Sequence, residues 1–194
     1  MPEPVDISSG PALICGLDPG LQRTGYGIIS TAGQHLKLVD AGFIATSADD
    51  ELPVRLAQLY AELRAIFQEY PRVRTAAVEE VYSHYRHPRT AVLMAHARGV
   101  LLLAAKDAGV QVLSLPATMV KKALVGFGRA GKMQVQRAVS IRLGLTLREE
   151  IPADVTDALA LAICGVEHMR SPQLAVRMAA QKAERRRESQ SGGA

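Results

Sequence analysis

The chain has 194 residues, of which 48% are hydrophobic and only 4% aromatic, and its formal net charge is +4. This length suits one domain with a full hydrophobic core, and no apolar run approaches the roughly 20 residues of a membrane-spanning helix, so we expect no membrane protein. The first eleven residues lack the basic start and apolar block of a signal peptide, which predicts a cytoplasmic protein.

The two cysteines, Cys15 and Cys164, both lie among apolar neighbours. A disulfide or a metal site built from two lone thiols is the alternative interpretation. We favour small buried hydrophobic residues, since free cysteine is among the most buried residue types.

Positive charge is concentrated in the second half of the chain. Between Val81 and Arg148 there are 11 Lys or Arg residues and a single acid, Asp107. Such segregation suits a polyanionic partner such as nucleic acid, although a merely solvated basic surface has the same composition. Residues 170–194 are again basic and end in Ser-Gln-Ser-Gly-Gly-Ala, which predicts a disordered tail, and residues 1–12 form a short N-terminal extension.

Hydrophobic patterning predicts an α/β protein. Apolar segments bounded by Gly or turn residues predict five strands, at 13–18, 25–31, 35–46, 73–81 and 110–115. The short loops between the first three strands favour antiparallel neighbours. Helical periodicity predicts helices that begin at the acids 49–51 and end before Pro71, cover 89–108, begin at Pro116, cover 132–143, and begin at Pro152.

The predicted helix over 89–108 is unusual, because its middle, Gly99 to Ala105, is apolar on every side. A helix that is apolar all round must be covered all round. A sheet can bury only one of its faces, so we expect the other face to meet a second subunit.

Acidic residues lie at the ends of several apolar segments. Asp18 closes the first strand and precedes Pro19 and Gly20, which turn the backbone away, although a turn-forming Asp would look the same. Glu79 and Glu80 end the fourth strand on opposite faces, so only one of them can share a site with Asp18.

Asp154 and Asp157 are three residues apart and therefore lie on one face of the last helix. Helix capping accounts well for Asp154 but poorly for Asp157, which lies one turn in.

Gathered carboxylates raise one another's pKa unless a cation neutralises them. All-oxygen ligands suit Mg²⁺ or Mn²⁺, and two such ions clamp the attacking and leaving oxygens of a displacement at phosphorus. An acidic metal site beside a basic surface therefore predicts a nuclease.

At these residues the sequence resembles RuvC-type Holliday junction resolvases, in unbroken order from about residue 13 to residue 163. The matching segments are Gly16-Leu17-Asp18-Pro19-Gly20, Thr24-Gly25-Tyr26-Gly27, Val78-Glu79-Glu80-Val81-Tyr82, Val120-Lys121-Lys122, Gly126-Phe127-Gly128, Lys132-Met133-Gln134-Val135-Gln136 and Ala153-Asp154-Val155-Thr156-Asp157-Ala158-Leu159-Ala160. The resemblance implies a ribonuclease H-like fold over 13–169, a five-stranded mixed sheet flanked by helices. It also implies a homodimer that nicks two opposed strands of a four-way DNA junction in recombination and repair, with a branch-migration motor of the RuvA and RuvB type as partner.

The resemblance also implies roles for individual residues. Asp18, Glu79, Asp154 and Asp157 resemble the family's metal-binding catalytic acids, holding two Mg²⁺ or Mn²⁺ ions per site. Lys121 and Lys132 resemble the basic residues near the scissile phosphate. Tyr82 resembles an aromatic that contacts bases at the junction centre, a position that is commonly Phe. We further expect DNA contacts from the neighbouring basic residues Arg86, Arg89, Lys122 and Arg129.

Three rival interpretations remain from the sequence. A ribonuclease H-like nuclease that processes ribosomal RNA precursors shares the Asp-x-Gly start but would not explain the segment 78–82 or the basic middle. A sugar-kinase or heat-shock-type ATPase half-domain needs a nucleotide domain for which this length leaves no room. A non-catalytic junction-binding protein is disfavoured, since four acids would repel bound DNA without a metal.

Overall fold

The computed structural model describes residues 12–80, 88–145 and 151–171, and every structural statement below concerns these residues. They form the strands β1 (Ala12–Asp18), β2 (Arg23–Ala32), β3 (His35–Ala45), β4 (Val73–Glu79) and β5 (Gln111–Leu115). The helices are α1 (Leu52–Glu69), α2 (Pro88–Asp107), α3 (Ala117–Val125), α4 (Lys132–Leu143) and α5 (Ala153–Arg170). The predicted extension 1–12 and the predicted tail 170–194 lie almost entirely outside the described residues.

The strands form one five-stranded sheet in the order β3-β2-β1-β4-β5. β1 pairs antiparallel with β2, and β2 pairs antiparallel with β3, whereas β4 is parallel to both β1 and β5. The predicted α/β class, the mixed sheet and the antiparallel first three strands are therefore confirmed.

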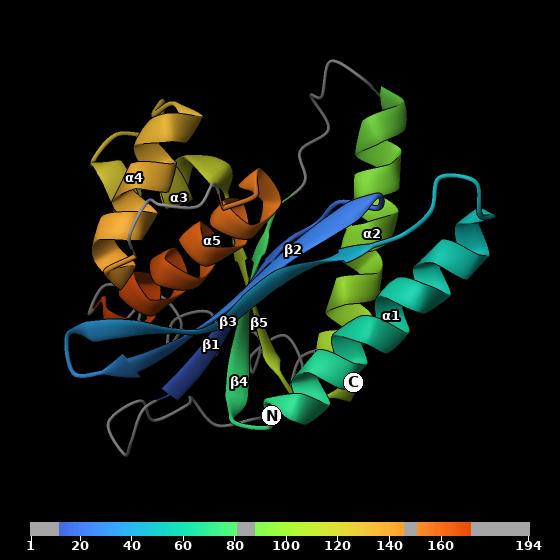
Figure 1. Cartoon of the computed structure of the whole chain (residues 1–194), viewed down its shortest axis with the longest axis horizontal. Helices are drawn as coiled ribbons and strands as arrows, with labels where there is room; N and C mark the ends of the chain where they lie inside the picture. The colour runs from blue at the N-terminus through green and yellow to red at the C-terminus, as the bar shows by residue number, and fades with distance from the viewer. Residues whose placement is uncertain (1–11, 81–87, 146–150, 172–194) are drawn as a thin grey trace, which may run out of the picture.

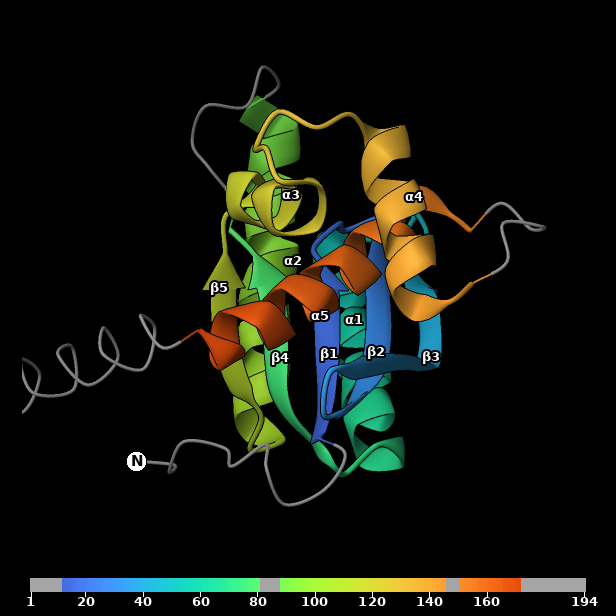
Figure 2. The ribbon, with the colours of Figure 1, turned by 90° about the vertical axis from the view of Figure 1, so that its left-hand side faces the viewer.

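Helices cover both faces of this sheet. α1 and α2 lie on one face, and α3, α4 and α5 lie on the other (Figures 1 and 2). Each face of the sheet has its own hydrophobic core, and alternate residues of β1 point into one or the other. Cys15 and Leu17 pack on the side of α1 and α2, and Ile14 packs on the side of α5. Cys15 and Cys164 are both free and buried, as predicted.

α5 lies directly against the centre of the sheet because glycines face it. A β-carbon at Gly16 would lie 1.8 Å from the carbonyl oxygen of Ala158, and one at Gly25 would lie 2.0 Å from the carbonyl oxygen of Asp154. Any other residue at either position would therefore force the helix away from the strands. This close approach sets the position of the N-terminal turn of α5 relative to β1 and β2.

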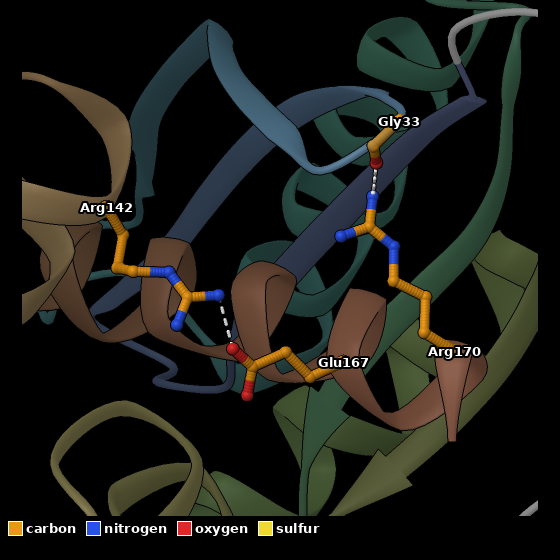
Figure 3. A network of polar contacts seen from close by, with 4 residues as sticks. All are labelled: Gly33, Arg142, Glu167 and Arg170. Atoms are coloured by element: carbon orange, nitrogen blue, oxygen red, sulfur yellow. Dashed lines mark hydrogen bonds and ion pairs between the residues drawn. The ribbon is translucent and has the colours of Figure 1, made fainter. Parts of the chain in front are cut away.

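The other end of α5 is fastened by polar contacts to two neighbouring elements (Figure 3). Arg170 donates a hydrogen bond to the carbonyl oxygen of Gly33 in the β2–β3 turn, and Glu167 pairs with Arg142 of α4. Both ends of the helix are thus fixed to the body of the domain.

Two predicted boundaries were wrong by a few residues. Of the acids 49–51, Glu51 is the N-cap residue of α1, whereas Asp49 and Asp50 lie in a preceding turn and donate their backbone N–H groups to Ser47. α1 begins instead at Leu52, with Pro53 in its first turn, where the missing N–H of proline is tolerated. β4 ends at Glu79 rather than at Val81.

None of the helices in residues 12–80, 88–145 and 151–171 combines the length and the apolar character needed to cross a bilayer.

Candidate active site

Strand register brings Asp18 and Glu79 together. Leu17 of β1 is the partner of Val78 in the adjacent parallel strand β4. Asp18 and Glu79 are the next residues of these two strands, so they lie side by side at the same end of the sheet. Alternation along each strand points both residues to the face covered by α5, as for Ile14 and Ala77. Glu80 follows the end of β4, and its backbone N–H donates to the carbonyl oxygen of Leu115 at 3.0 Å; its position on the face away from Asp18 stays a prediction.

The loop after Asp18 is held by threonines. The hydroxyl of Thr24 donates to the carbonyl oxygen of Gly20 at 2.7 Å, and the hydroxyl of Thr46 donates to that of Leu21 at 2.6 Å. These bonds fix the turn that Pro19 and Gly20 begin. Asp18 is therefore presented from a rigid strand end.

α5 supplies the remaining acids, Asp154 and Asp157, from its first turns. The backbone of Asp154 lies against Gly25, which is itself the strand partner of Asp18. Both aspartates are close enough to Asp18 for their negative charge to raise its pKa. The four predicted acids thus come from β1, β4 and α5 to one end of the sheet.

Burial and mutual repulsion raise the pKa of three of these carboxyl groups. Burial, followed by the charges of Glu79 and Asp157, raises the pKa of Asp18 to about 8, and Asp18 shares a hydrogen bond with Glu79. Burial also raises the pKa of Glu79 and the pKa of Asp157. Such carboxylates ionise together only when positive charge compensates them.

Two lysines supply part of that positive charge. Lys121 of α3 lowers the pKa of both Glu79 and Asp157, and Lys132 of α4 lowers that of Asp157. Lys132 occupies the first residue of its helix, where the side chain of Gln134 accepts a hydrogen bond from the N–H of Gly131 at 2.9 Å. The two lysines of the family resemblance therefore lie beside the acids.

Two further arginines contact this site, and neither was predicted from the sequence. Arg98 of α2 donates from Nε to the carbonyl oxygen of Glu79 at 2.9 Å and from its Nη2 to the Ser114 hydroxyl at 2.7 Å, which fixes the end of β4. Arg23 at the start of β2 pairs with Asp154, with 2.9 Å between Nε and Oδ2. The contacts of both arginines join residues that are far apart in the chain, so local sequence patterns do not predict them.

A hollow of about 300 Å³ opens beside the acids. It is lined by Lys132, Gln136, Ile151, Ala153, Thr156 and Asp157. The hydroxyl oxygen of Thr156 is buried there without a hydrogen-bond partner among the described residues. The hollow therefore offers the cation of Lys132 to an incoming anionic group.

The donor set fits a divalent cation by its chemistry, but the acids do not form a ready coordination shell. Within residues 12–80, 88–145 and 151–171, no three His, Cys, Asp or Glu side chains are arranged to hold one ion. In this arrangement Asp154 pairs with Arg23, and Asp18 shares a hydrogen bond with Glu79. A cation between the carboxylates would supply the neutralising positive charge itself. The carboxylate oxygens would be its ligands, and Mg²⁺ and Mn²⁺ prefer such oxygen ligands.

The other predicted DNA-binding residues are less closely tied to this site. Arg89, Lys122 and Arg129 are exposed to solvent, and their contacts with DNA stay a prediction. Tyr82 and Arg86 lie outside the described residues, so their expected contacts also stay predictions.

Sequence comparisons agree on one family. The family model described as crossover junction endodeoxyribonuclease RuvC matches residues 14–165. A protein of that name from Rhodopirellula baltica is 48% identical over 152 residues, which cover 78% of this chain and 84% of that protein. Another from Pelotomaculum thermopropionicum is 45% identical over 158 residues, which cover 80% of this chain and 93% of the relative.

Solved structures give the same result. RuvC from Thermus thermophilus, in complex with a Holliday junction substrate, superimposes with a TM-score of 0.76 at 29% identity, covering 82% of this chain and 95% of that one. The yeast mitochondrial Holliday junction resolvase Ydc2 superimposes with a TM-score of 0.55 over 81% of this chain and 82% of its own, and at 12% identity it supports the fold alone.

Proposed function

This chain belongs to the RuvC family of crossover junction endodeoxyribonucleases, and we propose that it resolves four-way DNA junctions by hydrolysing one phosphodiester bond in each of two opposed strands. The observation that carries this proposal is the meeting of acids from β1, β4 and α5 at one end of the sheet, with Lys121 and Lys132 beside them. Acids from separate elements do not gather by local sequence preference. Their convergence at the cost of raised pKa values is typical of a functional site.

The acids would hold Mg²⁺ or Mn²⁺, with two ions per site. When bound, these ions supply charge stabilisation at phosphorus and an activated water. Asp18, Glu79 and Asp157 would be the ligands, since the charges of Glu79 and Asp157 both act on Asp18 and the three residues project from the strand ends and the helix. Asp154 would join them once it is released from Arg23.

The lysines have a separate task in this proposal. Lys132 lines the hollow next to Asp157, where its ammonium group can pair with a phosphate oxygen of the cleaved strand. Lys121 compensates Glu79 and Asp157 and would oppose the negative charge that develops at the scissile group. Because DNA carries regular negative charge, both lysines would also hold the backbone in register.

The substrate assignment rests on the relatives. The Thermus thermophilus relative was solved with a Holliday junction substrate, and its fold covers most of this chain. We propose that Tyr82, Arg86, Arg89, Lys122 and Arg129 contact the junction here. An aromatic ring at the exchange point would stack on a base that has lost its neighbour.

A homodimer is the assembly that we propose, with α2 at its interface. α2 buries Ala97, Leu101 and Ala104 against the domain, while Val92 and Leu103 are each 55% exposed and Gly99 is open on the other side. Two-fold symmetry would place two identical sites on opposed strands of a nearly two-fold symmetric junction. We also propose a cytoplasmic location and contact with a branch-migration motor of the RuvA and RuvB type.

The test uses a synthetic four-way junction with labelled arms, incubated with the protein and Mg²⁺ or Mn²⁺. We expect paired nicks on opposed strands that depend on the metal ion. Linear duplex DNA and a structured ribosomal RNA precursor serve as controls and should be cut far more slowly. Faster cleavage of the RNA would favour the ribosomal nuclease instead, and tight junction binding without nicking would favour a binding protein.

A further inference from the structure

Arg23 is placed to act on the acidic site, although nothing in the family resemblance assigns it a role. Its Nε lies 2.9 Å from Oδ2 of Asp154, and its guanidinium carbon lies 3.9 Å from the centroid of the Phe43 ring. Phe43 belongs to β3, so the guanidinium is held between the edge of the sheet and the first turn of α5. Stacking on an aromatic ring fixes the plane of a guanidinium and leaves its N–H groups free to pair.

This ion pair occupies a carboxylate that the acidic site needs. Asp154 is close enough to Asp18 and to Asp157 for its charge to act on both groups. The ion pair orients the carboxylate of Asp154 toward Arg23, so a metal ion that draws this carboxylate toward the other acids has to compete with the guanidinium. Among the described residues, no three acidic, histidine or cysteine side chains are arranged to hold one ion.

The exposure of the pair allows it to exchange. The side chain of Arg23 is 43% exposed and that of Asp154 is 34% exposed, so solvent screens their attraction and the pair contributes little stability. A divalent cation between several carboxylates competes easily with such a pair, because it interacts with all of the carboxylates at once.

We propose that Arg23 is an exchangeable counter-ion of the acidic site, which pairs with Asp154 in the absence of metal and is displaced from it when a divalent cation binds. Arg23 is then a positioning residue, which acts through Asp154. The displaced guanidinium stays on the ring of Phe43 at the edge of the site, where phosphate oxygens of bound DNA can take the place of the carboxylate. This inference rests on the proposed metal site.

The test measures Mn²⁺ affinity of the full chain without DNA, by titration calorimetry or by the electron paramagnetic resonance signal of free Mn²⁺. Arg23→Ala should bind Mn²⁺ about three-fold more tightly than the wild type, as expected from the loss of one exposed competing pair. Arg23→Lys keeps a competing cation and should stay near the wild-type affinity. Arg142→Ala is the matched control, since Arg142 pairs with Glu167 at the other end of α5, and its affinity should equal that of the wild type.

A double variant separates direct competition from the loss of a distant positive charge. In an Asp154→Asn background, Arg23→Ala should cause no further tightening, because the pair is already broken. The proposal would be overturned if Arg23→Ala raised the Mn²⁺ affinity equally in the wild-type and Asp154→Asn backgrounds. It would also be overturned if Arg23→Ala alone left the Mn²⁺ affinity unchanged or lowered it. Failure of the wild type to bind Mn²⁺ would contradict the proposed metal site itself and with it this inference.

A second measurement follows the guanidinium directly. The Nε–H signal of Arg23 in a proton–nitrogen correlation spectrum should shift when diamagnetic Mg²⁺ is added, while that of Arg142 should stay in place. An unmoved Arg23 signal at saturating Mg²⁺ would show that the pair persists beside the metal and would overturn the proposal.

Discussion

The two ends of α5 carry the same kind of contact but serve different purposes. Arg23 pairs with Asp154 at the N-terminal end, and Arg142 pairs with Glu167 near the C-terminal end (Figure 3 shows the latter). The exposed fractions of the side chains are alike, 43% and 34% in the first pair and 39% and 31% in the second. Burial therefore does not distinguish the two pairs.

The surroundings of the two acids make the difference. Asp154 stands among further carboxylates that raise one another's pKa, whereas Glu167 stands beside Arg170, which bonds to the turn at Gly33. The N-terminal end of the helix thus brings several acidic groups together, and the C-terminal end only fastens the helix to its neighbours. Comparable surface ion pairs can be part of a functional site or purely structural, depending on what else lies nearby.

Replacing one acid at each end of α5 should give the largest difference in junction cleavage between the two ends. Asp18→Asn at the site should lower junction cleavage by more than the 10- to 100-fold that outer-shell changes around a metal typically cause. Junction binding should stay intact or tighten, since a negative charge facing phosphate is lost. Glu167→Gln should cleave within about two-fold of the wild type, as measured by gel assays of single-turnover nicking.

The result that would contradict this expectation is a parallel loss of binding and cleavage in Asp18→Asn, which would make the acid structural. Glu79→Gln and Asp157→Asn should behave like Asp18→Asn. Glu80→Gln changes the residue just after β4, which we predict to point away from the site, and should retain most of the activity.

The lysines beside the N-terminal end should have the next largest effect. Lys121→Ala and Lys132→Ala should each lower the rate of nicking by about 10- to 100-fold while lowering junction affinity much less, because they act on charge at the scissile phosphate. Lys122→Ala, the exposed neighbour of Lys121, should instead weaken binding and lower the salt slope by about 0.9. Equal effects of Lys121→Ala and Lys122→Ala would show that neither lysine is specific to the chemistry.

Local sequence patterns predict the elements of the fold better than they predict which elements meet at the site. The strands, the helices and the acids at their ends follow from local patterns, since apolar periodicity and turn residues report directly on local structure. The meeting of Asp18 with Glu79 needs the parallel pairing of β1 with β4, which local pattern does not specify and the family resemblance supplied.

What the sequence could not show depends on tertiary packing. The approach of α5 to Gly16 and Gly25 and the pairing of Arg23 with Asp154 both join segments that are far apart in the chain. The glycines of β1 and β2, among them the paired Gly16 and Gly27, are a sequence signal for this approach, because strands without side chains at these positions leave room for a helix backbone. For Arg23 no such signal exists.

The stability of the metal-free protein should fall as the pH rises. The pKa of Asp18 is about 8 in the folded chain and near 3.8 when unfolded, so between these values the folded state holds a proton that the unfolded state has released. Asp18 therefore stabilises the fold at low pH, and this contribution is lost as the pH rises from about 4 to 8. Differential scanning calorimetry should show a lower melting temperature at pH 8 than at pH 5.

Substitution localises this effect to the acidic site. Asp18→Asn should flatten the pH dependence and raise the melting temperature of the metal-free protein at pH 8 by a few degrees, at about 2–4 °C per kcal/mol for a chain of this size. Arg142→Ala should keep the wild-type dependence. A flat wild-type profile would mean that Asp18 is ionised without metal, contrary to its burial.

The C-terminal pair should have the smallest effect. Arg142→Ala should lower the free energy of unfolding by no more than about 1 kcal/mol, the upper range for exposed pairs, and should leave nicking unchanged. Urea denaturation of the metal-free chain gives the stability change. A loss well above that value would show that the C-terminal fastening in Figure 3 is central to the fold.

The most direct test of the N-terminal end as a metal site is a crystal structure of the full chain soaked in Mn²⁺, with anomalous difference maps. We expect anomalous peaks within about 2 Å of carboxylate oxygens of Asp18 and of Glu79 or Asp157, near the distances that octahedral divalent cations demand. Absence of any peak among these acids at saturating Mn²⁺, or a peak confined to acids elsewhere in the chain, would contradict the assignment of this end of the sheet as the catalytic centre.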